Sequence, residues 1–239
     1  MPYSKTYLDH NATSPLLPEA AHVMNEVAQQ AFANPSSPHW AGRDARILLE
    51  DARENLAHSL GAKPQEIFFT SGGSESNNAV IRQFLMKSGK QHLICSAVEH
   101  PSVLETCRIL ADQPNIDFTE LAVDSTGRLD PEKLLTSIRP ETVLISVITA
   151  NNETGNLQSI EELRKLAHER KIPFHTDLVQ AVCKIKLDLN ASRVDYATAT
   201  AHKLGGPRGI GLLYVKQGSP FQSLISGGKQ ERVRRAGTE

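Results

Sequence analysis

A lysine and an aspartate in the second half of the chain could together carry the chemistry of a ring-shaped cofactor. Lys203 lies beside the turn 205–207, and a lysine in a buried cleft can lose its proton and form a Schiff base with an aldehyde. Asp177 follows an apolar run, and a carboxylate there could hold a proton on a pyridine nitrogen, which makes the ring an electron sink. Taken singly, such side chains are more ordinarily solvated surface charges or loop caps.

Residues 70–78 add an anion-binding element, a turn of small residues between a predicted strand and a predicted helix. In this turn Gly73 and Ser74 would present backbone N–H groups, at the positive end of the helix dipole, to any anion. The turn is not a Walker A loop, because no Gly-Lys-Ser/Thr follows, and alone it is equally an ordinary tight turn. A Schiff-base lysine, a carboxylate and a phosphate loop are together what a site for pyridoxal 5'-phosphate (PLP) requires.

Further polar side chains follow the other apolar runs and would complete such a site. His100 could stack on the ring and move protons, or it could be a helix-capping or core histidine. Asn152 and Gln180 could both donate to a phenolic oxygen of the ring, or be routine buried amides. Thr200 and His202 could donate to the phosphate.

Two competing kinds of site find less support. A dinucleotide site would need Gly-x-Gly-x-x-Gly between a strand and a helix, and the closest stretch, 205–211, has the wrong order and runs into a predicted strand. A metal site is not expected, because no two histidines share a short spacing and no Cys/His cluster occurs.

The elements that must position these residues alternate between short apolar runs and helical segments. This pattern predicts an α/β fold with a mainly parallel sheet and helices on both faces. The last two strands are joined by a turn, which predicts one antiparallel strand. Ligands bind at the carboxyl ends of such strands, so the polar residues there should share one crevice. The seven predicted strands are 67–69, 92–95, 116–121, 143–148, 172–175, 195–198 and 210–215.

The helices carry start signals and one long apolar stripe. Asp130-Pro131 offers an N-cap before proline, and Ser159 with Glu162 matches a capping box. The first 40 residues, with one short helix around 17–30, are predicted to form an arm. A longer helix from residue 43 should bury one stripe and stop at Gly61. That stripe consists of Ala45, Leu48, Leu49, Ala52, Leu56 and Leu60.

The composition limits the class of protein. The 239 residues carry 26 Lys+Arg and 27 Asp+Glu, and a net charge of −1 provides no excess of cations for binding nucleic acid. No run reaches the roughly 20 apolar residues that span a bilayer, and the start lacks a secretory signal. Cys95, Cys107 and Cys183 have no Cys-x-x-Cys spacing, which is typical of reduced thiols. We therefore expect a cytoplasmic protein that binds neither nucleic acid nor membranes.

Taken together, the motifs resemble the cysteine desulfurases of the class V aminotransferase group, which are PLP enzymes of fold type I. The resemblance runs from Tyr7 to the last residue, and it rests on the order and spacing of motifs that are individually weak. It implies an N-terminal segment over 1–40 and a PLP-binding large domain over 41–239. The motifs lie at 7–13, 34–37, 70–77, 99–100, 151–155, 177–180, 202–206, 227–232 and 235–238.

The resemblance also implies roles for individual residues around the ring. Lys203 is similar to the lysine that forms the Schiff base, Asp177 to the partner of the pyridinium nitrogen, and Gln180 to the donor to the phenolic oxygen. His100 is similar to the ring-stacking histidine, which also acts as an acid or base. Asn152 falls where an amide contacts the cofactor and the substrate carboxylate.

At the phosphate end, the resemblance points to Gly73, Ser74, Thr200 and His202. The first two depart from the usual Ala-Thr, but serine keeps the hydroxyl, so little loss is expected. Thr238 matches a threonine that reaches the phosphate of a neighbouring subunit, which implies a homodimer.

The implied activity is conversion of L-cysteine to L-alanine, with the sulfur passed as an enzyme persulfide to partners in iron–sulfur cluster or thio-cofactor assembly. In the family a small domain carries the nucleophilic cysteine and follows the motif at 235–238, whereas this chain ends at Glu239. None of the three cysteines lies in a matching context, so we expect the chain alone to be inactive in sulfur transfer. The alternatives are a non-catalytic PLP-binding or dimer-scaffolding protein, and a lyase or aminotransferase acting on another amino acid.

Overall fold

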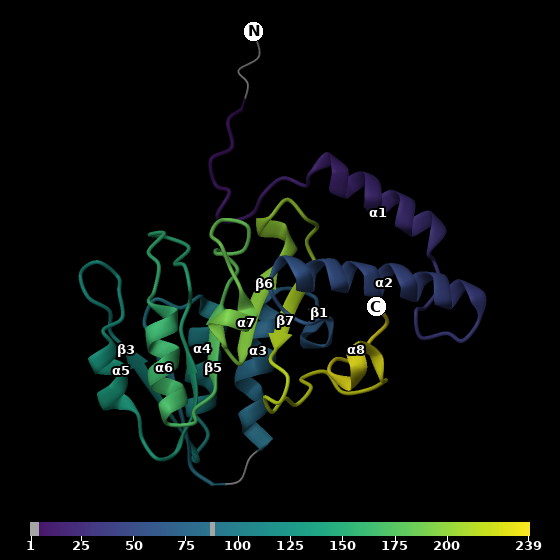
Figure 1. Ribbon diagram of the computed structural model, residues 1–239. Coiled ribbons are helices and arrows are strands. Elements are labelled where there is room, and N and C mark those ends of the chain that lie inside the picture. Colours follow the sequence, from purple (N-terminus) through teal and green to yellow (C-terminus); the bar gives the residue numbers. More distant parts are fainter. Residues whose placement is uncertain (1–4, 87–88) are drawn as a thin grey trace.

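The computed structural model describes residues 5–86 and 89–239, and its centre is a twisted seven-stranded sheet (Figure 1). The strand order is β1-β7-β6-β5-β4-β2-β3, and β7 runs antiparallel to both of its neighbours while the other pairs are parallel. This confirms the predicted fold, including the single antiparallel strand. The strands are β1 (Ile67–Thr70), β2 (Gln91–Ser96), β3 (Ile116–Leu121), β4 (Thr142–Ser146), β5 (Phe174–Asp177), β6 (Tyr196–Thr200) and β7 (Gly211–Val215).

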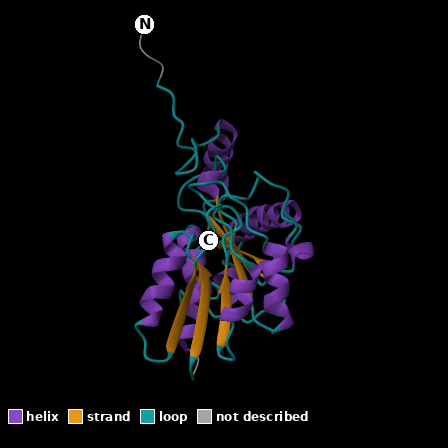
Figure 2. Cartoon of the chain, turned by 90° about the vertical axis from the view of Figure 1, so that its left-hand side faces the viewer, coloured by secondary structure: helices purple, strands orange, loops and turns teal. Residues whose placement is uncertain are grey.

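Helices cover both faces of the sheet (Figure 2). They connect successive parallel strands, as crossover connections in such a sheet require. The α-helices are α1 (Pro18–Gln30), α2 (Trp40–Ser59), α3 (Gly73–Arg82), α4 (Pro101–Ala111), α5 (Pro131–Ser137), α6 (Ile160–Glu169), α7 (Leu189–Ser192) and α8 (Gln230–Val233). Short 3-10 helices lie at Pro64–Glu66, Gln83–Met86 and Ala201–Lys203.

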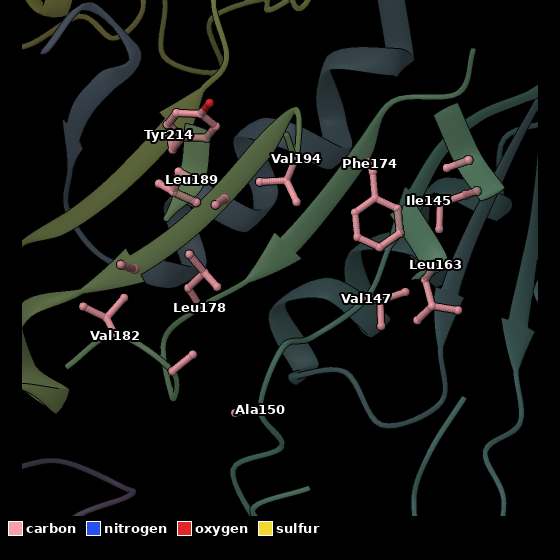
Figure 3. Close-up of a cluster of buried hydrophobic side chains, with 14 of the residues drawn as sticks. Ile145, Val147, Ala150, Leu163, Phe174, Leu178, Val182, Leu189, Val194 and Tyr214 are labelled. Atoms are coloured by element: carbon pink, nitrogen blue, oxygen red, sulfur yellow. The ribbon is translucent and has the colours of Figure 1, made fainter. Parts of the chain in front are cut away.

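Two apolar cores form because neighbouring residues of a strand point to opposite faces of the sheet. Leu93 and Leu144 belong to the core under α3 and α4, whereas Ile94 and Ile145 belong to the core that contains Leu163 of α6 (Figure 3). All five side chains are at most 1% exposed. Burying each contributes about 1.5–3 kcal/mol, and both cores together hold the strand ends in register.

The helix-start predictions were half right. Asp130 caps α5 by accepting from the Glu132 N–H at 2.9 Å, with proline at the first helical position. Ser159 does precede α6, but its side chain makes no capping hydrogen bond, so the predicted capping box is wrong. The ψ of 63° at Ser159 is not the extended conformation that aims a capping hydroxyl at the helix N–H groups.

The predicted buried stripe of the long helix was partly wrong. The helix, α2, begins at Trp40, and it exposes Leu48 (40%) and Leu56 (38%), while Ala45 is buried. The buried side also includes Arg53, which is 1% exposed because it pairs with a carboxylate far along the chain. Helix α1 has no buried residue, and its ribbon lies at the edge of the molecule (Figure 1).

In the part of the chain that the structure describes, no helix combines the length and the apolar character needed to cross a membrane.

Candidate active site

A cavity of about 610 Å³ lies where the carboxyl ends of the strands meet the N-terminal segment. It brings together polar residues from five strand ends, as the sheet topology predicts. Thr238, by contrast, is exposed and does not line this cavity. Nine of the ten residues expected at the site line it: Gly73, Ser74, His100, Asn152, Asp177, Gln180, Thr200, His202 and Lys203.

Asp177, the last residue of β5, is 2% exposed. Its Oδ2 accepts from Asn77 Nδ2, and its Oδ1 accepts from the Val179 N–H, both at 2.8 Å. Burial raises the pKa of Asp177, while these hydrogen bonds and the charges of His100 and Lys203 oppose that rise. A cationic partner, such as a protonated ring nitrogen, would stabilise the ionised form of a carboxylate that is buried in this way.

Lys203 ends the short 3-10 helix after β6 and is held by the N-terminal segment. Its Nζ donates to the Ala12 carbonyl at 2.8 Å and also to the Asn11 carbonyl. The pKa of Lys203 is lowered, first by burial and then by the charge of Lys184, against the attraction of two carboxylates. A lower pKa increases the unprotonated fraction of the amine, which is the form that attacks an aldehyde.

Lys184 also orients the Gln180 amide. Its Nζ donates to Gln180 Oε1 at 2.6 Å and to Asn11 Oδ1 at 3.1 Å. Because Lys184 occupies Oε1, the NH2 group of Gln180 is the donor on the other side, and it donates to the Asn11 carbonyl at 2.9 Å. The amide is therefore set as a donor within the cavity.

The start of α3 supplies backbone donors at one end of the cavity. Its hydrogen-bond ladder begins with the Ser76 N–H donating to the Gly72 carbonyl, so the amides of Gly73, Ser74 and Glu75 precede the ladder. Such amides suit a phosphate. A Cβ at Gly73 would lie 3.1 Å from Val179 Cγ2, so the absence of a side chain there relieves a tight contact.

The side chains of Thr200, His202 and Asn152 each form a hydrogen bond within the protein. Thr200 Oγ1 donates to the Ile210 carbonyl at 3.1 Å, and His202 Nδ1 lies 3.1 Å from Thr13 Oγ1. The pKa of His202 is lowered by burial and by neighbouring cations. Asn152 Nδ2 donates to a carboxylate oxygen of the adjacent residue at 2.7 Å.

Glu99 lies beside the site and is nearly buried, with 7% of its surface exposed. One oxygen accepts from the hydroxyl of Ser96 and from the Ile148 N–H at 2.6 Å, while the other has no hydrogen-bond partner in the described part of the chain. Burial raises the pKa of Glu99 to about 8, and the charge of Asp177 adds to the rise. This shift favours the protonated, neutral form of Glu99 at neutral pH.

Sequence reasoning about individual residues missed several groups that line the cavity. Asp9 and Asn11 come from the N-terminal segment, and Asn77 and Ser102 come from α3 and α4. All but Ser102 fall inside the motifs at 7–13 and 70–77, which indicated the family but did not predict the contacts of these residues.

The donor set fits PLP. The cavity is within the ~300–1,000 Å³ typical of small-molecule sites. It joins an amine of lowered pKa, a buried carboxylate and free amides at a helix start. Among residues 5–86 and 89–239, no group of three or more His, Cys, Asp or Glu side chains could hold a metal ion.

Comparisons with known proteins identify the family of the chain. The model of the aminotransferase class-V family matches residues 6–238. The chain is 45% identical over 237 residues to the cysteine desulfurase IscS of Dictyoglomus turgidum, covering 98% of this chain and 60% of that protein. It is 44% identical to a cysteine desulfurase of a Nostoc species, covering 99% and 59%. The chain thus spans about 60% of the length of these curated relatives.

Two solved structures share the fold closely. A NifS-like protein superposes with a TM-score of 0.94 at 36% identity, covering 99% of this chain and 66% of that one. A structure described as SspA in complex with cysteine gives a TM-score of 0.93 at 39% identity, covering 98% and 69%.

Proposed function

The chain belongs to the aminotransferase class-V family, and from this premise we propose that its cavity binds PLP and serves a cysteine desulfurase. In that reaction the C–S bond of L-cysteine breaks, a thiol acceptor takes the sulfur as a persulfide, and L-alanine leaves. The 40–45% identity to curated desulfurases supports this choice of substrate over other amino acids.

When bound, PLP would supply an electron sink for the carbanion that forms next to the substrate amino group. Lys203 would attach it covalently through Nζ, and Asp177 would hold the proton of the ring nitrogen. The Gln180 amide would donate to the phenolic oxygen. Asn152 would bind the substrate carboxylate.

The phosphate would lie at the start of α3. Gly73 and Ser74 would donate there through their amides, and Thr200 and His202 would contact it through their side chains. Thr238 would reach the phosphate bound by a second copy of the chain, since it lies outside its own cavity. The dimer is supported by large apolar side chains that α1 and α2 leave exposed, including Val23 and Ile47.

The acceptor thiol is not assigned to this chain's cysteines. Cys95 and Cys107 are buried, and Cys183 does not line the cavity. Proteins of iron–sulfur cluster or thio-cofactor assembly are the proposed final recipients of the sulfur. The three unpaired thiols support a cytoplasmic location.

The observation that carries the proposal is one cavity that holds both a buried carboxylate and an amine of lowered pKa. The test is to load the chain with PLP, remove unbound PLP, and titrate with L-cysteine while recording the absorption spectrum. A saturable change that L-serine does not reproduce is expected, with Lys203→Ala as the control. Identical responses to both amino acids would favour the lyase or aminotransferase alternative, and no response would favour the scaffold.

A further inference from the structure

The imidazole of His100 caps α4 through one defined nitrogen. The Ser102 N–H donates to His100 Nδ1 at 3.1 Å, and Ser102 Oγ lies 2.8 Å from the same nitrogen. A backbone N–H can only donate, so Nδ1 must accept. An accepting Nδ1 carries no proton, and in a neutral imidazole the proton is then on Nε2.

The Ser102 hydroxyl is itself oriented by a chain of donors. Asn77 Nδ2 donates to Ser102 Oγ at 2.9 Å and to Asp177 Oδ2 at 2.8 Å. The carboxylate of Asp177 can only accept when ionised, which fixes the NH2 group of Asn77 on this side of the amide. Because Ser102 Oγ accepts from Asn77, its own hydrogen is free to point at His100 Nδ1.

The opposite arrangement would leave two conflicts. A proton on Nδ1 of His100 would face the fixed N–H of Ser102, which would lose its acceptor. Ser102 Oγ would then accept from both Asn77 and His100, and the hydroxyl hydrogen would lose Nδ1 as its acceptor. The hydrogen bonds that connect Asp177, Asn77, Ser102 and His100 are therefore all satisfied only when Nδ1 of His100 is an acceptor.

We propose that Ser102 is a positioning residue that holds neutral His100 as the tautomer with its proton on Nε2, so that His100 serves the cavity as a hydrogen-bond donor. The mechanistic meaning rests on the proposed function: Nε2 of neutral His100 donates a hydrogen bond to the reacting groups and cannot take a proton from them. The acid-or-base role expected from the sequence is thereby narrowed to that of a hydrogen-bond donor at Nε2.

The tautomer can be measured without turnover. Histidine labelled with ¹⁵N in the ring is incorporated into the whole chain, and two-bond ¹H–¹⁵N correlations are recorded at about pH 9, well above the ordinary imidazole pKa of about 6.5. His100 is assigned by the signals that disappear in His100→Asn. The expected pattern is Nε2–H, both without PLP and after loading.

Ser102→Ala removes one of the two donors to Nδ1 and keeps the backbone N–H. The ratio of Nε2–H to Nδ1–H tautomer should fall by roughly three- to tenfold, as expected for one neutral hydrogen bond. Ser102→Thr, which retains the hydroxyl, should restore the ratio. Thr106→Val is the matched control, because Thr106 Oγ1 donates to the Ser102 carbonyl at 2.8 Å on the same helix and does not contact the ring.

The outcomes separate this inference from the proposed function. An Nδ1–H pattern for His100, or an unchanged ratio in Ser102→Ala, would overturn the inference even if the chain binds PLP. A chain that shows the Nε2–H pattern and responds to Ser102→Ala but takes up no PLP would uphold the inference on the tautomer and contradict the proposed function.

Discussion

A buried ion pair joins the last segment of the chain to the body of the fold. Arg53 on α2 and Glu231 on α8 are 1% and 2% exposed, and two hydrogen bonds of 2.8 Å link the guanidinium to the carboxylate. Glu231 also accepts from the Phe69 N–H at 2.8 Å, and Arg53 donates to the Ile67 carbonyl at 2.8 Å. These contacts hold the segment that carries Thr238.

Replacing Glu231 with Gln removes the buried counterion of Arg53 and leaves only Glu50, whose half-exposed carboxylate lies 3.1 Å from Arg53 Nε. Breaking one partner of a buried pair costs about 3–5 kcal/mol in the free energy of unfolding. For a chain of this length, 1 kcal/mol shifts the melting temperature by about 2–4 °C, so the variant should melt about 6–20 °C lower.

The assay is calorimetric or fluorescence-detected melting of the whole chain at fixed pH and concentration. Arg139→Gln is the matched control, because Arg139 pairs with Asp117 at 3.0 Å while the two side chains are 46% and 65% exposed, and such a pair contributes about 0–1 kcal/mol. The double variant Arg53→Met/Glu231→Met should be less destabilised than the sum of its single changes. A melting temperature for Glu231→Gln within about 2 °C of the control would refute the reasoning.

Two further predictions concern titration. Burial raises the pKa of Glu99 to about 8 in the folded state, whereas a glutamate in the unfolded chain titrates near its ordinary pKa of about 4.3. Between these two values only the folded state holds the proton. The free energy of unfolding should therefore fall by about 1.4 kcal/mol for each pH unit as the pH rises. Glu99→Gln should remove that slope, which urea unfolding from pH 5 to 8 would reveal; parallel wild-type and variant curves would contradict it. Lys184→Met removes one of the causes that lower the pKa of Lys203, so that pKa should rise. NMR of ¹³C-methylated Lys203 would measure the change, and an unchanged midpoint would show that Lys184 does not act on Lys203.

Local patterns in the sequence predicted the sheet well, but not the partners of distant residues. The strand 116–121 has the predicted bounds, and polar residues at strand ends do share one cavity, because apolar alternation and parallel topology decide both. The stripe on α2 was partly wrong: Leu48 and Leu56 are exposed, whereas Arg53 is buried beside a carboxylate 178 residues later. No local rule signals such a pair.

The same limit applies to the site. The carbonyl that receives the Lys203 ammonium belongs to Ala12, 191 residues earlier, and the cap that fixes His100 depends on Ser102 and on an amide from another helix. The high pKa of Glu99 arises from burial, which becomes visible only when β2 and β4 are packed. The role of Thr238 stays a prediction.

The most direct test of the account is covalent trapping on Lys203. The purified chain is mixed with PLP, reduced with borohydride, digested and analysed by peptide mass, with Lys203→Ala in parallel. The account predicts a pyridoxyl group on the peptide that contains Lys203, and none in the variant. Modification of another lysine such as Lys184, or equal modification of the variant, would contradict the central claim that this cavity is a PLP site built around Lys203.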